Sequence, residues 1–159
     1  MIAVLQRVKR AAVSVENETV GECGRGLCIL LGVAKGDTEA DAEALLNKIV
    51  DLRIFPDDSG RMNLSLCDVD GELLIVSNFT LLASYKKGKR PDYMGAAAPA
   101  EADRLYTYFC DLAEKRVKHA ARGVFGTDMD IEMVNAGPVT IVMDSDVLLK
   151  KNRSDGENK

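Results

Sequence analysis

Short runs of alternating or continuous apolar residues predict a chain built largely of strands. Residues 12–22, AVSVENETVGE, alternate on either side of a polar turn at Asn17-Glu18, which predicts a β-hairpin. Residues 24–37, GRGLCILLGVAKGD, form a nearly continuous apolar run between glycines, as in a strand buried on both faces. Residues 72–84, ELLIVSNFTLLAS, predict a further strand that stops at the polar pair Ser77-Asn78.

Two segments have the spacing of amphipathic helices. The first begins at Asp37 or Thr38, either of which can cap it, and the second begins near Pro99, a residue favoured in the first helical turn. The second helix is predicted to end in a basic turn before Gly123. The apolar stripes are Ala42, Leu45, Leu46 and Ile49 in the first helix and Ala102, Leu105, Tyr106, Phe109, Leu112 and Ala113 in the second.

Two closing strands are predicted on either side of an interruption at Gly137-Pro138. Residues 128–134, DMDIEMV, alternate between apolar and acidic positions, and residues 139–144, VTIVMD, are rich in β-branched residues. The Gly-Pro pair fits an ordinary hairpin turn. It fits equally well a special backbone conformation that lets another surface come close.

The order of elements is therefore strands, helix, strand, helix, strands. This order predicts an α/β chain of the α+β type, with mostly antiparallel sheets and two main helices on one face. No linker or repeat divides the chain, so we expect one domain over residues 1–149 and a flexible tail over residues 150–159.

The composition limits the class of protein, its location and the cofactors it can bind. Apolar residues make up 47 % of the chain and charged residues 29 %, as in globular proteins, and the longest apolar run is too short to cross a membrane. With no signal peptide in the pattern, we expect a cytoplasmic protein. Four cysteines without a C-x-x-C pair and a single histidine, His119, argue against a zinc site, and no cofactor motif is found, so we predict neither metal nor cofactor.

Charge is concentrated at one place. The formal net charge of −4 excludes a general polyanion binder, yet residues 85–93, YKKGKRPDY, gather Lys86, Lys87, Lys89 and Arg90 around a glycine. Such a run is a solvated loop more often than a phosphate-binding site. Arg7, in an otherwise apolar segment, either points inward toward carbonyl or carboxylate partners or extends to solvent.

Ser77 and Thr80 lie where a buried strand ends, a common place for catalytic residues. A hydroxyl nucleophile needs a base, and His119 lies at the far end of a predicted surface helix, which argues against a Ser-His-Asp triad. Backbone N–H groups near Thr80 could instead hold a developing oxyanion. A structural role, in which the hydroxyls satisfy a strand end, fits the local pattern about as well.

Taken together, these segments resemble the D-aminoacyl-tRNA deacylase family. The resemblance reaches to about residue 144 and rests on QRV, GLCILLGV, RIFPDDSGRMNLSL, SNFTLLA, KGKRPDY, FGTDM and NAGPVT, in the family's order and spacing. SNFTL stands where the family has Ser-Gln-Phe-Thr-Leu, and NAGPVT stands where it has Asn-x-Gly-Pro-x-Thr.

The resemblance implies a homodimer with a layered β/β/α fold and two composite sites at the interface. Gly137 and Pro138 of one subunit, joined by a cis bond, would face the catalytic residues of the other and leave no room for an L-aminoacyl side chain, whereas D-aminoacyl and glycyl groups fit. The implied catalytic residues are Ser77, Asn78, Phe79 and Thr80, and the implied supporting residues are Arg7, which holds the Gly-Pro pair, Met129, which lines the pocket, and Asn135.

The implied reaction is hydrolysis of the ester between a D-amino acid and the 3′-terminal adenosine of tRNA. The adenosine 2′-hydroxyl would take part in catalysis, N–H groups near Phe79 and Thr80 would stabilise the oxyanion, and the basic loop at residues 86–90 would contact acceptor-stem phosphates. Two alternatives are a non-catalytic tRNA-binding module and an esterase with Thr80 as its nucleophile.

The chain departs from the family pattern at two positions. Asn78 replaces a glutamine and is one methylene shorter, and Ala136 stands where an acidic residue is common. A related family with a trans Gly-Pro bond tolerates small L-amino acids. Retention of Ser77 and Phe79 favours the D-specific branch.

Overall fold

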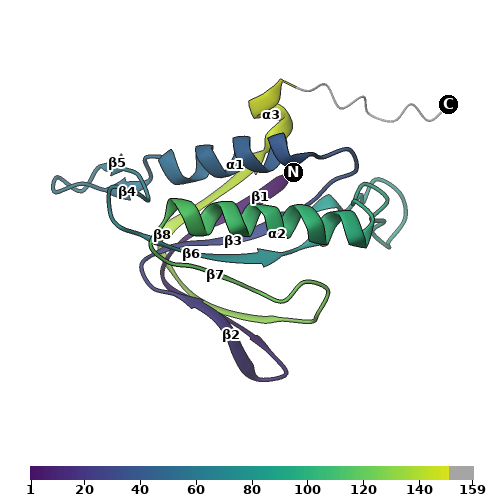
Figure 1. The fold of residues 1–159 in the computed structure, drawn as a ribbon, viewed down its shortest axis with the longest axis horizontal. Helices are drawn as coiled ribbons and strands as arrows, with labels where there is room; N and C mark the ends of the chain where they lie inside the picture. The colour runs from purple at the N-terminus through teal and green to yellow at the C-terminus, as the bar shows by residue number, and fades with distance from the viewer. Residues whose placement is uncertain (151–159) are drawn as a thin grey trace.

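The computed structural model describes residues 1–150, which form eight strands, three α-helices and one 3-10 turn (Figure 1). The strands are β1 (Ile2–Val15), β2 (Glu18–Cys23), β3 (Gly26–Gly32), β4 (Phe55–Pro56), β5 (Met62–Leu64), β6 (Glu72–Ser77), β7 (Ala120–Arg122) and β8 (Asp130–Asp144). The helices are α1 (Glu39–Asp51), α2 (Pro99–Arg116) and α3 (Ser145–Leu149), and the 3-10 turn is η1 (Phe79–Leu82).

Strand β1 organises the main sheet. It pairs antiparallel with β8 along nearly its whole length, with β3 along its first half and with β2 along its second half. Strands β6 and β7 then continue the sheet in parallel from β3. The sheet is therefore mixed: the pairs around β1 are antiparallel, as predicted for most of the sheet, and the β3–β6 and β6–β7 pairs are parallel. Strands β4 and β5 form a separate small antiparallel pair.

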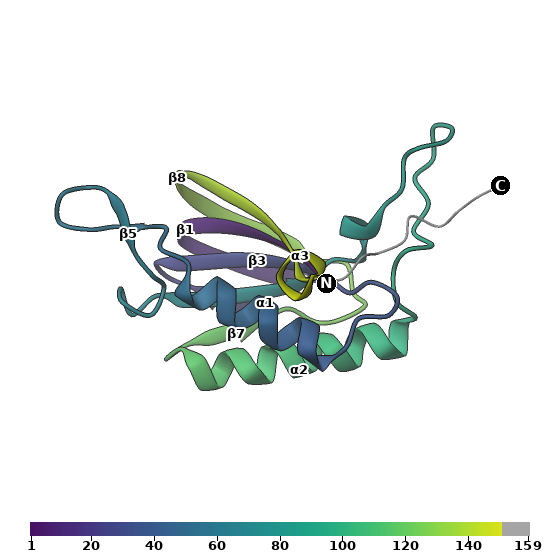
Figure 2. The same cartoon turned by 90° about the horizontal axis from the view of Figure 1, so that it is seen from above.

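Alternation along β3 and β6 gives the molecule two cores. Leu27, Ile29 and Ile75 belong to the larger core, which lies against the helices, while Cys28 and Leu74 point to the other face and join a second cluster. Figure 2 shows α1 and α2 side by side along one face of the sheet. Because β3 and β6 are covered on both faces, the continuous apolar run predicted for a doubly buried strand is confirmed, and so is the layered β/β/α class.

Both predicted helices are present with the expected buried faces. Helix α1 starts after Thr38, whose amide and hydroxyl both donate to Asp41 Oδ2. Helix α2 starts at Pro99, and its predicted stripe is buried except for Leu112, which is half-buried. The predicted basic last turn is confirmed, with Lys115 and Arg116, but α2 ends at Arg116 rather than close to Gly123, because residues 120–122 pair with β6 and form β7.

The N-terminal hairpin is confirmed with its turn one residue earlier than predicted. Glu16 and Asn17 occupy the turn with φ of 49° and 67°. Positive φ at both central residues is the geometry whose twist matches that of hairpin strands, and asparagine adopts it at little cost.

The two predicted closing strands are one strand, so the hairpin interpretation of Gly137-Pro138 was wrong. Both halves of β8 pair with β1, because β1 is long enough to offer partners to each. Thr140 pairs with Gln6 and Asn135 pairs with Val8, so residues 136–139 lie opposite the single residue 7. The interruption is a bulge in a continuous strand, a feature that bends the strand and re-aims its residues.

The C-terminal end of the described chain holds one element that the pattern did not predict. Helix α3 follows β8 directly and packs on α1, and Lys150, in the left-handed region with φ of 53°, ends it. The rest of the predicted tail, residues 151–159, lies outside the described residues.

Candidate functional site

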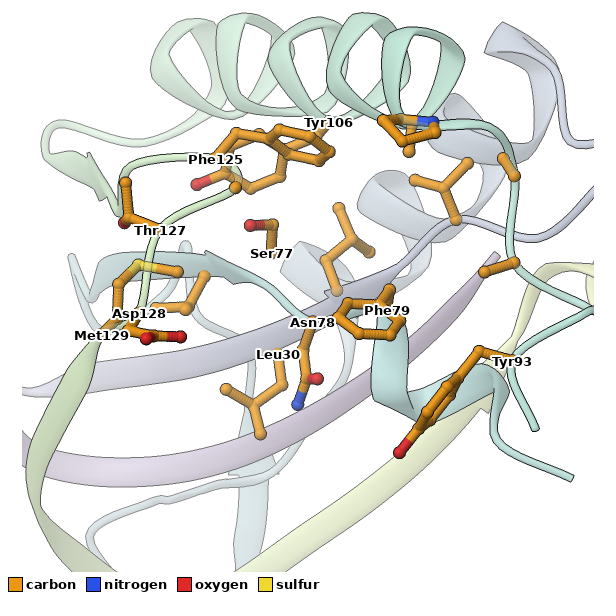
Figure 3. Close-up of a pocket in the computed structure, with 18 of the residues that line it drawn as sticks. Leu30, Ser77, Asn78, Phe79, Tyr93, Tyr106, Phe125, Thr127, Asp128 and Met129 are labelled. Carbon is orange, nitrogen blue, oxygen red and sulfur yellow. The ribbon is translucent and has the colours of Figure 1, made fainter. Parts of the chain in front are cut away.

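A cavity of about 630 Å³ opens at the carboxyl ends of the parallel strands β3 and β6 (Figure 3). Its walls are the end of β6 with η1, the first half of α2, residues 93–97, and residues 125–129 before β8. The lining is mostly apolar, with a few polar groups from Ser77, Asn78, Thr127 and Asp128. Such a volume and lining are typical of small-molecule sites, and strand carboxyl ends are their usual place in parallel sheets.

The turn after β6 is shaped by Asn78. Its N–H donates to the Leu31 carbonyl at 2.8 Å, which extends the β3–β6 ladder by one bond. Its side-chain oxygen then accepts from the Thr80 N–H at 3.1 Å and from the Thr80 hydroxyl, so Asn78 caps η1. The strand therefore stops at the predicted polar pair because asparagine redirects the backbone into a 3-10 turn.

Close approach of this turn to β3 requires Gly32. A Cβ there would lie 2.5 Å from Leu82 Cδ2 and 3.0 Å from the Asn78 carbonyl oxygen. Any larger residue at position 32 would push the turn outward and change the shape of the cavity.

Three of the four predicted catalytic residues line the cavity: Ser77, Asn78 and Phe79. Thr80 is exposed and does not line it. The Thr80 N–H, proposed for an oxyanion, is engaged by Asn78, and its hydroxyl also donates to that amide oxygen, which is not a proton-accepting base. Phe79 begins η1, and the first N–H groups of a helix lack partners within it.

Aromatic side chains form two sides of the cavity. Phe79 is 57 % exposed and meets Tyr93 edge to face, with ring centroids 5.0 Å apart. On the other side, the buried Tyr106 packs near Phe125 and donates its hydroxyl to the Ile75 and Gly123 carbonyls, at 2.9 and 3.3 Å. Burial raises the pKa of Tyr106 well above its usual value, so its hydroxyl is a structural donor.

Sequence reasoning missed Tyr106 as a cavity residue because its place in an apolar stripe marks it as core. Its hydroxyl was the available signal, since a buried phenol needs a partner at the end of a strand or loop. Met129, predicted to line a pocket, does line this one, together with its neighbour Asp128 (Figure 3).

Gly137 and Pro138 lie outside the cavity of their own chain and are exposed. The bond between them is cis, and Gly137 has φ of 137°. Arg7 points inward: its Nε donates to the Ala136 carbonyl at 2.8 Å, and Nη1 donates to the carbonyl of Ile54. The bulge is thus fastened to the body of the molecule, whereas Asn135 before it is an exposed strand residue paired with β1.

The basic loop projects from the body of the molecule (Figure 2), and Tyr93 at its end lines the cavity. An antiparallel bridge closes its base, with hydrogen bonds between Ser84 and Asp92 at 2.8 and 2.9 Å. Its four cations, Lys86, Lys87, Lys89 and Arg90, are all exposed, and none forms an ion pair within residues 1–150.

The single histidine and the buried cluster of three aspartates lie away from the cavity lining. His119 is exposed, with a ring nitrogen 2.8 Å from the Glu22 carbonyl, and does not line the cavity. Asp37, Asp41 and Asp146 bring buried carboxylates within 4.8 Å of one another, but the Met1 ammonium group lies 2.8 Å from Asp37, and we assign this cluster a structural role.

Within residues 1–150, no helix has the length and apolar character needed to span a membrane.

Comparison with solved structures defines the class of fold. A structure titled c-Myc DNA Unwinding Element Binding Protein superposes with a TM-score of 0.86 at 39 % identity, covering 91 % of this chain and 98 % of that one. A probable eukaryotic D-amino acid tRNA deacylase shares the fold, with a TM-score of 0.76 at 18 % identity and coverage of 90 % and 98 %.

Sequence comparison gives the family. The family model for D-Tyr-tRNA(Tyr) deacylase matches residues 4–144. D-aminoacyl-tRNA deacylases from Dehalococcoides mccartyi and Caldicellulosiruptor saccharolyticus are 57 % and 54 % identical over 145 residues, which is 91 % of this chain and 95 % and 97 % of theirs. The chain belongs to the D-aminoacyl-tRNA deacylase family, a family of hydrolases, and the predicted resemblance is confirmed.

Proposed function

We propose that the protein hydrolyses the ester bond of D-aminoacyl-tRNA in the cytoplasm, releasing a D-amino acid and free tRNA. Family membership supports the reaction, and the apolar cavity with polar groups from Ser77 and Asn78 supports its location. Glycyl-tRNA is a second substrate of the same site, because a glycyl group has no side chain to exclude.

One observation carries the proposal that the site is shared between two subunits. The Gly137–Pro138 bulge is fastened by Arg7, yet it is exposed and contributes nothing to the cavity of its own chain. A backbone segment that is held in place yet exposed is suited to contact a second molecule. In a homodimer, each bulge would enter the cavity of the other subunit, where its carbonyl oxygens would occupy the space that an L-aminoacyl side chain needs.

Catalysis would use the substrate as well as the protein. His119 lies outside the cavity, and Asp128, the one carboxylate on the lining among residues 1–150, lies across it from Phe79 (Figure 3). We therefore assign the activating role to the 2′-hydroxyl of the terminal adenosine. The Phe79 N–H, at the start of η1, would stabilise the oxyanion, while Asn78 holds the turn.

Two further assignments complete the proposal. Lys86, Lys87, Lys89 and Arg90 would contact acceptor-stem phosphates, which favours a polyanion at this edge despite the net charge of −4. A covalent role for Thr80 is disfavoured because its hydroxyl donates to an amide oxygen rather than to a base.

The direct test compares hydrolysis of D-Tyr-tRNA, L-Tyr-tRNA and Gly-tRNA. We expect cleavage of the first and third only, and loss of cleavage when the terminal adenosine lacks its 2′-hydroxyl. Equal cleavage of both enantiomers would refute chiral selection. Binding without hydrolysis would favour a tRNA-binding module, and undiminished cleavage of the 2′-deoxy substrate would favour a protein nucleophile.

A mixed-dimer experiment tests the shared site. Arg7→Ala frees the bulge, so its homodimers should cleave both D- and L-Tyr-tRNA, whereas Asn78→Ala homodimers should cleave neither well. When limiting Arg7→Ala subunits are re-associated with excess Asn78→Ala subunits, each intact catalytic half receives an intact bulge from its partner. Cleavage of L-Tyr-tRNA should then fall while cleavage of D-Tyr-tRNA persists; unchanged L-cleavage would show that each chain uses its own bulge.

A further inference from the structure

The exposed aromatic side chains of this protein gather at the basic loop. The chain has four tyrosines, four phenylalanines and no tryptophan, and within residues 1–150 the exposed ones are Phe79, Tyr85 and Tyr93. Tyr85 is 84 % exposed, the highest value among them. An aromatic ring left almost wholly in water has no part in the core, so the place of Tyr85 next to the bridge that also adjoins Tyr93 indicates a contact surface.

These rings lead from the cavity to the loop. Phe79 and Tyr93 stand together at one edge of the cavity (Figure 3). The bridge between Ser84 and Asp92 then brings the two sides of the loop together, and Tyr85 and Tyr93 each adjoin one of the bridged residues. Beyond Tyr85 lie the four exposed cations.

Aromatic rings interleaved with cations are the features that bind single-stranded nucleic acid. The rings stack on bases, and the cations follow the phosphates. The proposed function requires the terminal adenosine to occupy the cavity. The unpaired nucleotides that precede it must then cross one of the cavity walls, and the edge formed by Phe79 and Tyr93 is one candidate. Arg104, on the α2 wall, is paired with Glu39 and Glu101, whereas the four loop cations beyond Tyr85 form no ion pair within residues 1–150, which favours the path over Phe79 and Tyr93.

We propose that Tyr85 is a positioning residue that stacks on an unpaired nucleotide adjoining the terminal adenosine of the substrate. This proposal rests on the proposed function. It assigns Tyr85 to binding of the tRNA end, separate from the chemistry of the ester and from the phosphate contacts of the lysines.

The test uses two substrates: D-Tyr-tRNA, and D-tyrosyl-adenosine, which carries the same ester without the preceding nucleotides. For Tyr85→Ala we expect KM for D-Tyr-tRNA to rise about 10-fold, in line with the stacking of one base, with kcat nearly unchanged. Both constants for D-tyrosyl-adenosine should stay at wild-type values. Tyr85→Phe should restore KM because it keeps the ring, whereas Tyr85→Leu should not.

Two controls make the result specific. Tyr108→Ala removes a half-buried tyrosine on α2, outside the cavity, and should behave as wild type on both substrates. Lys87→Ala should lower the salt dependence of tRNA binding by about one unit of slope, and Tyr85→Ala should leave that slope unchanged.

Outcomes separate this proposal from the proposed function. Wild-type protein that cleaves neither substrate would overturn the proposed function, and the stacking role with it. Wild-type cleavage of both, with an equal loss or no loss on both in Tyr85→Ala, would overturn the stacking role alone. Failure of Tyr85→Phe to restore KM would also overturn it, because the ring would then be irrelevant.

Discussion

Replacing Asn78 with alanine separates the structural role of the turn after β6 from its proposed role in catalysis. The amide oxygen of Asn78 accepts from both the N–H and the hydroxyl of Thr80, and alanine removes both bonds. Thr80 is exposed, so water replaces the lost acceptor, and the change should lower the free energy of unfolding by about 1 kcal/mol. For a chain of this size, that corresponds to a fall of about 2–4 °C in Tm.

Activity should fall much further than stability, because η1 also carries the Phe79 N–H at the cavity edge. We expect kcat for D-Tyr-tRNA to drop at least about 10-fold, the loss of roughly 1.4 kcal/mol of transition-state stabilisation. Thermal unfolding and single-turnover hydrolysis measure the two effects on the same preparation.

Thr38→Ala is the matched control. Thr38 caps α1 through its bond to Asp41, so its loss should lower Tm by a similar amount, but it does not line the cavity. Wild-type activity in both variants would refute the catalytic role of the turn. Faster hydrolysis by Asn78→Ala would also refute it, since it would mean that Asn78 obstructs the Thr80 N–H rather than positioning the turn.

Four further predictions follow from single contacts and from the burial of three thiols. Gly137→Ala should permit cleavage of L-Tyr-tRNA, because at φ of 137° a Cβ would lie 3.0 Å from Arg7 Nη2 and displace the bulge; continued rejection of the L-substrate would contradict this. Tyr106→Phe should lower unfolding free energy by about 1–3 kcal/mol in denaturant titrations, because it leaves the buried Gly123 carbonyl without a donor, and a change below about 0.5 kcal/mol would speak against it. Burial raises the pKa of the thiols of Cys23, Cys28 and Cys110 from 9.0 to about 11, 12 and 12, so a thiol reagent at pH 8 should titrate Cys67 alone until the chain is unfolded. Since these pKa values are higher in the folded state, stability should decline as pH rises from about 9 toward 12, and a denaturation midpoint independent of pH in this window would refute the burial effect.

The sequence alone determined those features that depend on neighbouring residues. Alternation and continuous apolar runs identified β3, β6 and both halves of β8, the pair Asp37-Thr38 marked the start of α1, and Pro99 marked the start of α2. The predicted end of the strand at Ser77-Asn78 is confirmed for the same reason. The Asn78 side chain accepts a hydrogen bond from a backbone N–H only two residues away, so the interaction is local.

The tertiary structure decided where distant segments meet. Whether residues 130–144 made a hairpin or one strand depended on β1, which pairs with both halves and leaves a bulge opposite Arg7. The direction of Arg7, the pairing of β7 with β6 and the place of Tyr106 in the cavity wall likewise depend on partners 17 to 129 positions away. Local patterns record which residues prefer burial and which backbone they tolerate, but the partner that satisfies each group is fixed only when the sheet and helices pack together.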